Sequence, residues 1–224
     1  MNNHQKGYRR VREIVEAVDR CGVLDAVQIE LLIYGGRSES NKRQAQRKLQ
    51  KLHKLRRLNR GRVAVSQPYH YYTGKAPGQP EHRLATNWIY LWMLKNLKNW
   101  ETLHSFDYEP DYKLLRADAL ASVKNKVTGK FLFYFIEADL SHNPFDKVKK
   151  YNDLYASERY AGSWWVNLAD RFPAVIVATE SESRLKAIQK AVDEENVHGL
   201  EFRAYLLDHL KEVCRGCPAN SITH

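Results

Sequence analysis

The sequence predicts an α/β protein in two parts, a small basic helical domain followed by a larger domain of strands and helices. Three observations lead to this prediction. The 224 residues carry a formal net charge of +10, but residues 1–65 hold 16 Lys and Arg against 6 Asp and Glu, whereas residues 66–224 hold 20 of each. Helical periodicity dominates the first part, and apolar runs of strand length dominate the second. A stretch rich in proline and glycine separates them.

Composition excludes several classes of protein. Hydrophobic residues make up 43% of the chain and charged residues 28%, which is typical of a folded domain rather than a disordered chain. No apolar run approaches the roughly 18 residues of a membrane span, and the first residues lack the apolar core of a secretory signal. Three cysteines do not form a disulfide framework. We therefore expect a cytoplasmic protein without membrane contact.

Two short helices are expected first. One covers residues 8–20, where apolar side chains recur at helical spacing: Val11, Ile14, Val15 and Val18. Asp25 can cap the next helix. Its expected buried face consists of Ile29, Leu32 and Ile33.

A third helix is expected after Gly35 and Gly36, capped by Ser38 or Ser40 and ending near residue 58. Its apolar stripe consists of Ala45, Leu49, Leu52 and Leu55. At about 100° per residue, the opposite face is cationic and consists of Arg43, Arg47, Lys51, Lys54 and Arg57. The window 37–62 holds eleven bases and one acid, so few neighbours can neutralise this face.

A short hairpin over residues 60–72, with basic residues at its tip, should follow. Three helices, the third of them basic, followed by a basic hairpin, is the order of a winged helix-turn-helix, in which the third helix enters the major groove. The expected contacts to double-stranded DNA are Lys42, Arg43, Gln44, Arg47, Lys51, Lys54, Arg57, Arg60 and Arg62. The cations would contact phosphates, whereas Asn41, Gln44 and Gln46 are better suited to base edges. The alternatives are a solvated basic helix and an RNA-binding helix.

The second part predicts the order αβββαβαβ, an α/β layer structure. The expected ranges are a helix over 84–98, strands over 103–108, 114–124 and 131–137, a helix over 144–160, a strand over 174–179, a helix, and a strand over 201–207. We expect domains at 1–73 and 82–210, a linker at 74–81 and a flexible tail at 211–224. Cys214 and Cys217 have the spacing of half a zinc site, but reduced thiols in the tail are the simpler interpretation.

Three acids are expected to meet at the ends of the second and third strands. Glu137 and Asp139 are two residues apart, so they project from the same face of a strand, and Asp118 belongs to the neighbouring strand. Carboxylates that converge in this way can bind Mg²⁺ or Mn²⁺ for cleavage of a phosphodiester. Lys147 on the following helix can supply an assisting cation. The alternative is that these acids are paired with nearby bases.

Three segments together resemble the replication-relaxation family of plasmid and mobile-element proteins. They are Arg116-Ala117-Asp118-Ala119, Phe133-x-x-x-Glu137-Ala138-Asp139 and Lys147-Val148-Lys149-Lys150-Tyr151. Members of this family join a winged helix to a domain similar to the PD-(D/E)XK restriction-endonuclease fold. The resemblance implies an N-terminal winged helix-turn-helix followed by an αβββαβ nuclease-like domain.

By this resemblance, Asp118 and Glu137 match the two acids of the motif, while Asp139 replaces its lysine and Lys147 is the substitute. The implied function is DNA binding that assists plasmid replication or conjugative mobilisation, with a relaxase or replication initiator as partner and a homodimer as a further possibility. Because a motif residue is replaced, we expect DNA binding without catalysis and no cofactor. The alternatives are a Mg²⁺- or Mn²⁺-dependent endonuclease and a winged-helix transcriptional repressor.

Overall fold

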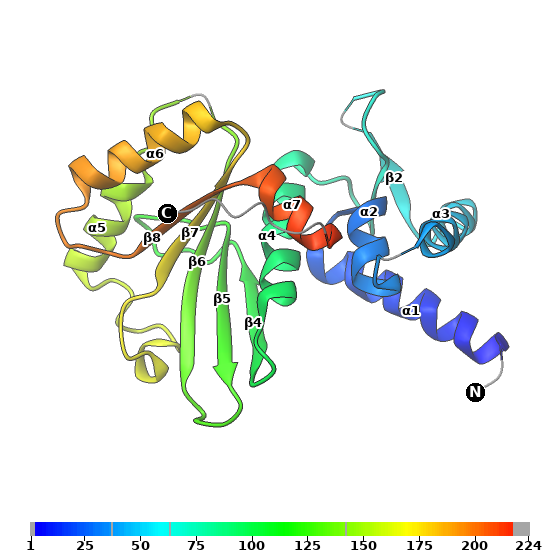
Figure 1. Ribbon diagram of the computed structural model, residues 1–224, viewed down its shortest axis with the longest axis horizontal. Helices are drawn as coiled ribbons and strands as arrows, with labels where there is room; N and C mark the ends of the chain where they lie inside the picture. Colours follow the sequence, from blue (N-terminus) through cyan, green and yellow to red (C-terminus); the bar gives the residue numbers. More distant parts are fainter. Residues whose placement is uncertain (1–2, 37, 63, 142, 217–224) are drawn as a thin grey trace. The chain divides into compact units, whose positions relative to one another are not determined.

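The computed structural model describes residues 3–36, 38–62, 64–141 and 143–216 (Figure 1). It confirms a mixed α/β protein, with a five-stranded mixed sheet and a small three-stranded antiparallel sheet. The chain forms two compact units: the N-terminal unit comprises Met1–Leu91 with Glu212–His224, and the sheet unit comprises Trp92–Lys211. Among the described helices, none combines the length and the apolar character that crossing a bilayer requires.

The N-terminal unit contains three principal helical segments and a small sheet. Its elements are α1 (Asn3–Cys21), β1 (Leu24–Asp25), α2 (Ala26–Ile29), the π-helical η1 (Glu30–Tyr34), α3 (Glu39–Lys54), β2 (Asn59–Gly61), β3 (His70–Tyr72) and the first part of α4 (Pro80–Asn96). The helix after Asp25 therefore has two parts, because it widens into a π-helix after one α-helical turn.

Side-chain caps set the helix boundaries in this unit. Asp25 caps α2 in a reciprocal capping box with Gln28, which satisfies two backbone N–H groups that would otherwise lack partners. Gly35, at a φ of 74°, ends the π-helical segment. Ser38 then caps α3 by accepting a hydrogen bond from the backbone N–H of Asn41. Of the two serines expected as caps, Ser38 is the one used.

The core of the N-terminal unit agrees with the expected apolar stripes except at their ends. The buried residues include Ile14, Val18, Ile29, Ala45, Leu49 and Leu52. Leu32 and Ile33 are only half-buried, because they lie in the π-helical segment and not in a continuous α-helix. Leu55 was expected to be buried but is 60% exposed, because α3 ends at Lys54 and the helical periodicity stops there.

The small sheet has the strand order β1-β3-β2, with both pairings antiparallel. The hairpin strands are shorter than expected and pair Gly61 with His70. A Cβ added to Gly61 would lie 2.6 Å from Nε2 of His70, a residue that is only 5% exposed. This glycine therefore allows the two strands to approach each other.

The boundary between the units falls inside α4 rather than in residues 74–81. Hydrogen bonds explain the difference, because the side chain of Gln28 donates to the Leu84 carbonyl and that of Asn87 donates to the Val23 carbonyl. Residues 211–215, expected in a tail, belong to α7 (Leu207–Arg215), in which Cys214 is buried. Cys217 lies outside the described residues.

The sheet unit has the strand order β4-β5-β6-β7-β8. Its elements are β4 (Glu101–Tyr108), β5 (Ala119–Asn125), β6 (Phe131–Asp139), α5 (Lys147–Ser157), the 3-10 helix η2 (Val166–Leu168), β7 (Ala174–Thr179), α6 (Glu182–Glu195) and β8 (Phe202–Leu206). The first three strands pair antiparallel, and β6, β7 and β8 pair in parallel. The expected element order is therefore present, with β5 starting later than predicted.

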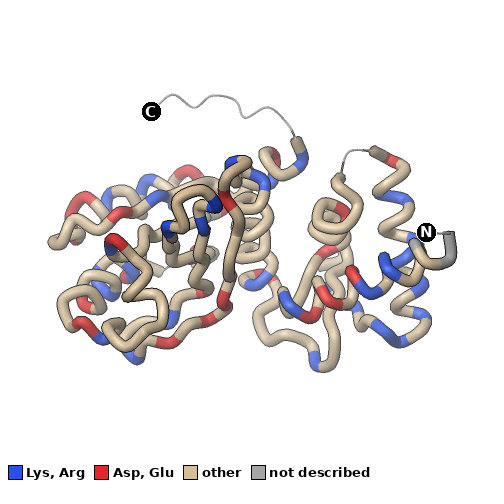
Figure 2. Tube along the Cα trace, turned by 90° about the horizontal axis from the view of Figure 1, so that it is seen from below, with Lys and Arg blue, Asp and Glu red and all other residues tan. Residues whose placement is uncertain are grey.

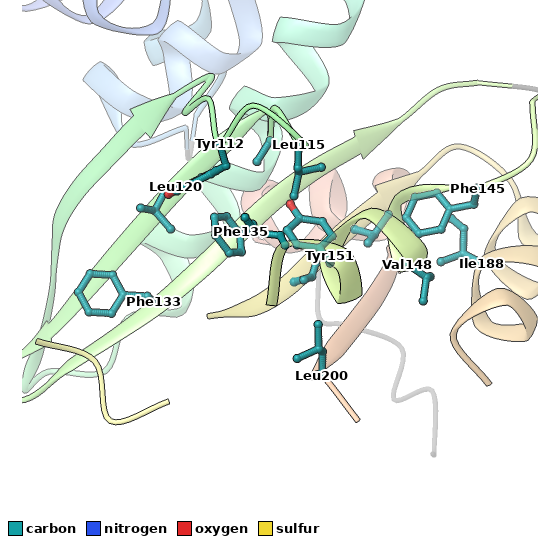
Figure 3. Close-up of a cluster of buried hydrophobic side chains, with 14 of the residues drawn as sticks. Tyr112, Leu115, Leu120, Phe133, Phe135, Phe145, Val148, Tyr151, Ile188 and Leu200 are labelled. Atoms are coloured by element: carbon teal, nitrogen blue, oxygen red, sulfur yellow. The ribbon is translucent and has the colours of Figure 1, made fainter. Parts of the chain in front are cut away.

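Helices α5 and α6 cover one face of this sheet (Figure 1). The buried cluster between these helices and the sheet includes Phe135, Val148, Tyr151 and Ile188 (Figure 3). The rings of Phe135 and Tyr151 lie 5.1 Å apart between centroids. Since each buried aromatic side chain removes about 150–250 Å² from water, this cluster fixes α5 against β6 and so determines what lies beside the end of β6.

Candidate functional site

The exposed face of α3 is cationic, as the sequence predicts. Arg43, Arg47, Lys51 and Lys54 are exposed, and none of them forms an ion pair with a residue that the structure describes. Lys42 is also exposed, with its Nζ 3.4 Å from a carboxylate oxygen of Glu39. Figure 2 shows that Lys and Arg positions, in blue, predominate near the N-terminus. This face carries charge that the protein itself does not neutralise.

The polar residues proposed for base edges are not equivalent. Gln44 and Gln46 are exposed, and the side-chain amide of Gln44 donates to Oγ of Ser40 at 3.2 Å. The amide of Asn41 instead donates to the Tyr34 carbonyl at 2.7 Å, so it links α3 to the preceding turn. Gln44 and Gln46 remain available for an external partner, whereas Asn41 has a structural role.

The hairpin cations are held by an aromatic ring. The guanidinium carbons of Arg60 and Arg62 lie 4.2 Å and 3.7 Å from the ring centroid of Tyr69. Such cation–π contacts stabilise by about 0.5–1 kcal/mol each at exposed sites. Arg57 lies after the end of α3 and follows Arg56, whose φ is 55°, so it does not share the helix face.

Two of the three expected acids lie close together at the same end of neighbouring strands. Asp118 immediately precedes β5, whose first residue, Ala119, pairs with Ile136, the residue before Glu137. The Asp118 N–H donates to the Ile136 carbonyl at 3.1 Å, and Oδ2 of Asp118 accepts from the Ala138 N–H at 2.7 Å. These backbone contacts hold the Asp118 carboxylate beside Glu137.

Glu137 is buried and fully engaged. Its side chain contacts Nζ of Lys147 through both oxygens, at 2.9 Å and 3.0 Å, and Oε1 also accepts from the Tyr151 hydroxyl at 2.7 Å. Burial, followed by the nearby charge of Asp118, raises the Glu137 pKa to about 8, although Lys147 and the two hydrogen bonds act in the opposite direction. Lys147 also donates to the Arg116 carbonyl at 3.0 Å, so it links the segment that precedes β5 to the end of β6.

Asp139 does not join the other two acids. Arg184, in the first turn of α6, donates to both of its carboxylate oxygens, through Nε at 2.5 Å and through the terminal nitrogen at 3.0 Å. Both side chains are largely buried, at 9% and 15% exposure. The acid expected as the third metal ligand is therefore the acceptor of a bidentate ion pair, because α6 brings a cation to the end of β6.

The donors fit a divalent cation only in part. Within residues 3–36, 38–62, 64–141 and 143–216, no three His, Cys, Asp or Glu side chains group as metal ligands. Asp118 and Glu137 offer two adjacent carboxylates, but Lys147 and Tyr151 already bind Glu137. Mg²⁺ prefers octahedral oxygen ligands and usually keeps several waters, so two carboxylates can suffice. A cation bound here would compete with Lys147 for the Glu137 carboxylate.

Two residues of this site were not anticipated from the sequence. Tyr151 is four residues after Lys147, and this spacing places both side chains on one face of α5, so a signal existed. Arg184 is 45 residues from Asp139 and carries no local signal. A basic groove beside α3 also went unpredicted, because its walls come from separate helices.

Comparisons with known proteins add no relative, since no family model, curated protein or solved structure matches the chain. Its function is therefore inferred from its own residues.

Proposed function

We propose that this protein binds double-stranded DNA through its N-terminal unit, with α3 in the major groove and the β2–β3 hairpin against the flanking backbone. The observation that carries the proposal is the exposed face of α3, whose cations have no ion-pair partner among the described residues except for the contact of Lys42 with Glu39. The element order α1-β1-α2-α3-β2-β3, with sheet order β1-β3-β2, supports a winged helix-turn-helix.

Phosphates are the natural counter-charge for this surface. Each phosphate contact made by a Lys or Arg releases condensed counterions, which favours binding at low salt. Gln44 and Gln46 lie among these cations and can pair with base edges in the major groove. Arg60 and Arg62, oriented by Tyr69, suit a backbone contact by the hairpin.

The biological role that we propose is accessory: DNA binding that assists replication or conjugative mobilisation of a plasmid or related element. The sequence resemblance to the replication-relaxation family supports this role, and a relaxase or replication initiator is then the protein partner. Glu137 and Asp139 are each bound by a cation of the protein itself, Lys147 and Arg184 respectively, and this internal pairing favours binding over cleavage.

The test replaces three α3 cations together, as Arg43→Gln/Arg47→Gln/Lys51→Gln. We expect weaker binding to labelled duplexes of all sequences, because phosphate contacts carry no sequence information. The slope of log K against log salt should become shallower by up to ~0.9 per lost contact. Fluorescence anisotropy across a salt series measures both quantities.

A matched control is Lys186→Gln/Lys190→Gln/Lys211→Gln, which removes the same charge from the sheet unit. It should bind DNA nearly as the unchanged protein does. Equal loss in both triple variants would mean that only net charge matters, and undiminished binding by the α3 variant would overturn the assignment of α3.

A Mg²⁺- or Mn²⁺-dependent endonuclease is the second candidate, favoured by the meeting of Asp118, Glu137 and Lys147. The order αβββαβ and the mixed sheet support a PD-(D/E)XK-like domain. Asp118 and Glu137 would hold the ion, which would neutralise charge on the phosphate and activate water. Lys147 would then stabilise the negative charge that develops on the leaving oxygen of the phosphodiester.

Supercoiled plasmid incubated with either cation tests this candidate. Nicking by the unchanged protein that is lost in Asp118→Ala/Glu137→Ala would establish the nuclease. If neither protein nicks the plasmid, or both do so equally, the candidate should be abandoned.

A further inference from the structure

A concave basic surface lies between α1 and α3 in the N-terminal unit. This α1–α3 groove has a volume of about 830 Å³. Five cations line it, Arg9 and Arg10 from α1 and Arg47, Lys48 and Lys51 from α3, together with one acid, Glu13. A concave wall with an excess of one charge sign focuses the electrostatic field, so this groove should attract anions more strongly than a flat surface with the same charges.

Contacts inside the protein determine which of these cations can bind a ligand. The Arg10 guanidinium donates to the Ile33 carbonyl and lies 4.8 Å from the Tyr34 ring centroid, so it fastens α1 to the end of η1. Nε of Arg9 lies 2.7 Å from Glu13, but the Arg9 side chain is 64% exposed. Lys48 and the two other α3 cations have no ion-pair partner among the described residues. Arg10 therefore stabilises the groove, whereas Arg9 and the α3 cations are available to bind a ligand.

We infer that the phosphodiester backbone of the duplex bound by α3 lies in the α1–α3 groove, so that α1 forms part of the DNA contact. This inference rests on the proposed DNA binding and extends it to Arg9 and Lys48. Arg47 and Lys51 belong both to the groove and to the exposed α3 face, so the groove opens directly onto that face. A single extended anion can therefore occupy the groove and contact the rest of the α3 face at the same time. This continuity favours the backbone of one duplex over a separate small anion.

The experiment uses the full chain and the double variant Arg9→Gln/Lys48→Gln, titrated with labelled duplexes of unrelated sequence. We expect affinity to fall for every sequence, on the order of 10-fold or more at 0.1 M salt, and the salt slope to become shallower by up to ~1.8 for two lost contacts. The matched control is Arg12→Gln/Lys75→Gln. Arg12 is on the same helix but does not line the groove, and Lys75 is exposed outside it.

Glu13→Gln tests the inference in the opposite direction. Removing the acid of the groove should tighten DNA binding, whereas structural damage would weaken it. Far-UV circular dichroism should be unchanged in all three variants, because the substituted side chains lie on the surface or at the groove wall.

The outcomes separate this inference from the proposed function. If the unchanged protein binds no duplex, both fail. If it binds, and the α3 triple variant is weakened while Arg9→Gln/Lys48→Gln equals its control, the groove inference is overturned and the proposed function stands. Loss for one sequence only would also overturn it, since backbone contacts affect all sequences alike.

Discussion

The cations of α3 and the acids at the end of β6 are two groups of charged residues whose charges are compensated in different ways. Arg43, Arg47 and Lys51 are exposed and lack ion-pair partners among the described residues. Glu137 and Asp139 are buried or nearly so, and each is bound by a cation from a neighbouring helix.

Burial explains the difference. A charge removed from water must be paired or neutralised, because an isolated ion in a nonpolar interior costs several kcal/mol. Surface charges carry no such requirement, so they can remain available for an external partner. The α3 face is therefore suited to binding, whereas the acids of β6 contribute first to the fold. The following substitutions test that contrast.

Breaking the pair of Asp139 and Arg184 should have the largest effect. Arg184→Met leaves the Asp139 carboxylate largely buried without its cation, and we expect a loss of about 3 kcal/mol in the free energy of unfolding. Urea denaturation of the full chain measures this loss. Lys190→Met, on the same helix, breaks an exposed pair with Glu194 and should cost less than about 1 kcal/mol. A similar cost for both variants would contradict the contrast, and Asp139→Asn/Arg184→Met should recover part of the stability.

The second effect is a pH dependence centred on Glu137. Its pKa is about 8 in the folded protein, above its ordinary value of 4.5, so between these values the folded state keeps a proton that the unfolded state has lost. The free energy of unfolding contributed by this group therefore decreases as pH rises from about 4.5 to about 8, by up to a few kcal/mol. Urea denaturation of the unchanged protein and of Glu137→Gln at pH 5, 6.5 and 8 isolates the contribution of Glu137 to the free energy of unfolding. The free energy of unfolding of the unchanged protein should fall relative to that of Glu137→Gln as the pH rises, and a value of unchanged minus variant that stays constant or increases with pH would contradict this prediction.

The smallest effect is expected from neutralising α3. Arg43, Arg47 and Lys51 follow one another at i,i+4 spacing, where like charges repel by about 0.2–0.5 kcal/mol per pair. Arg43→Gln/Arg47→Gln/Lys51→Gln should therefore leave stability unchanged or raise it by up to about 1 kcal/mol, while DNA binding weakens. A loss of stability above about 1 kcal/mol would show that these cations have a structural role.

The sequence predicted elements best where one physical pattern dominates. Residues 174–179 form an apolar run, and β7 has those same bounds because every residue in it is buried. The start of β5 was placed too early. Residues before it form a turn with positive φ at Glu109 and Lys113, and apolar patterning does not reveal such backbone conformations.

The candidate site was predictable only as far as local spacing reaches. Asp118, Glu137 and Lys147 were identified because strand ends and helix starts bring such residues together. Asp139 was grouped with them because residues two apart on a strand project from the same face. Its actual partner is Arg184, which lies on a helix 45 residues later in the sequence. This ion pair depends on how α6 packs against the sheet, and no local sequence pattern predicts that packing.

The close approach of Gly61 to His70 links two positions that are nine residues apart. A side chain at position 61 and an imidazole at position 70 cannot occupy the same space, since a Cβ would lie 2.6 Å from Nε2 of a buried ring. Among proteins descended from the same ancestor, a larger residue at position 61 should therefore occur together with a smaller one at position 70. The two positions are expected to covary, and the hairpin can change its charged tip in evolution without changing this pair.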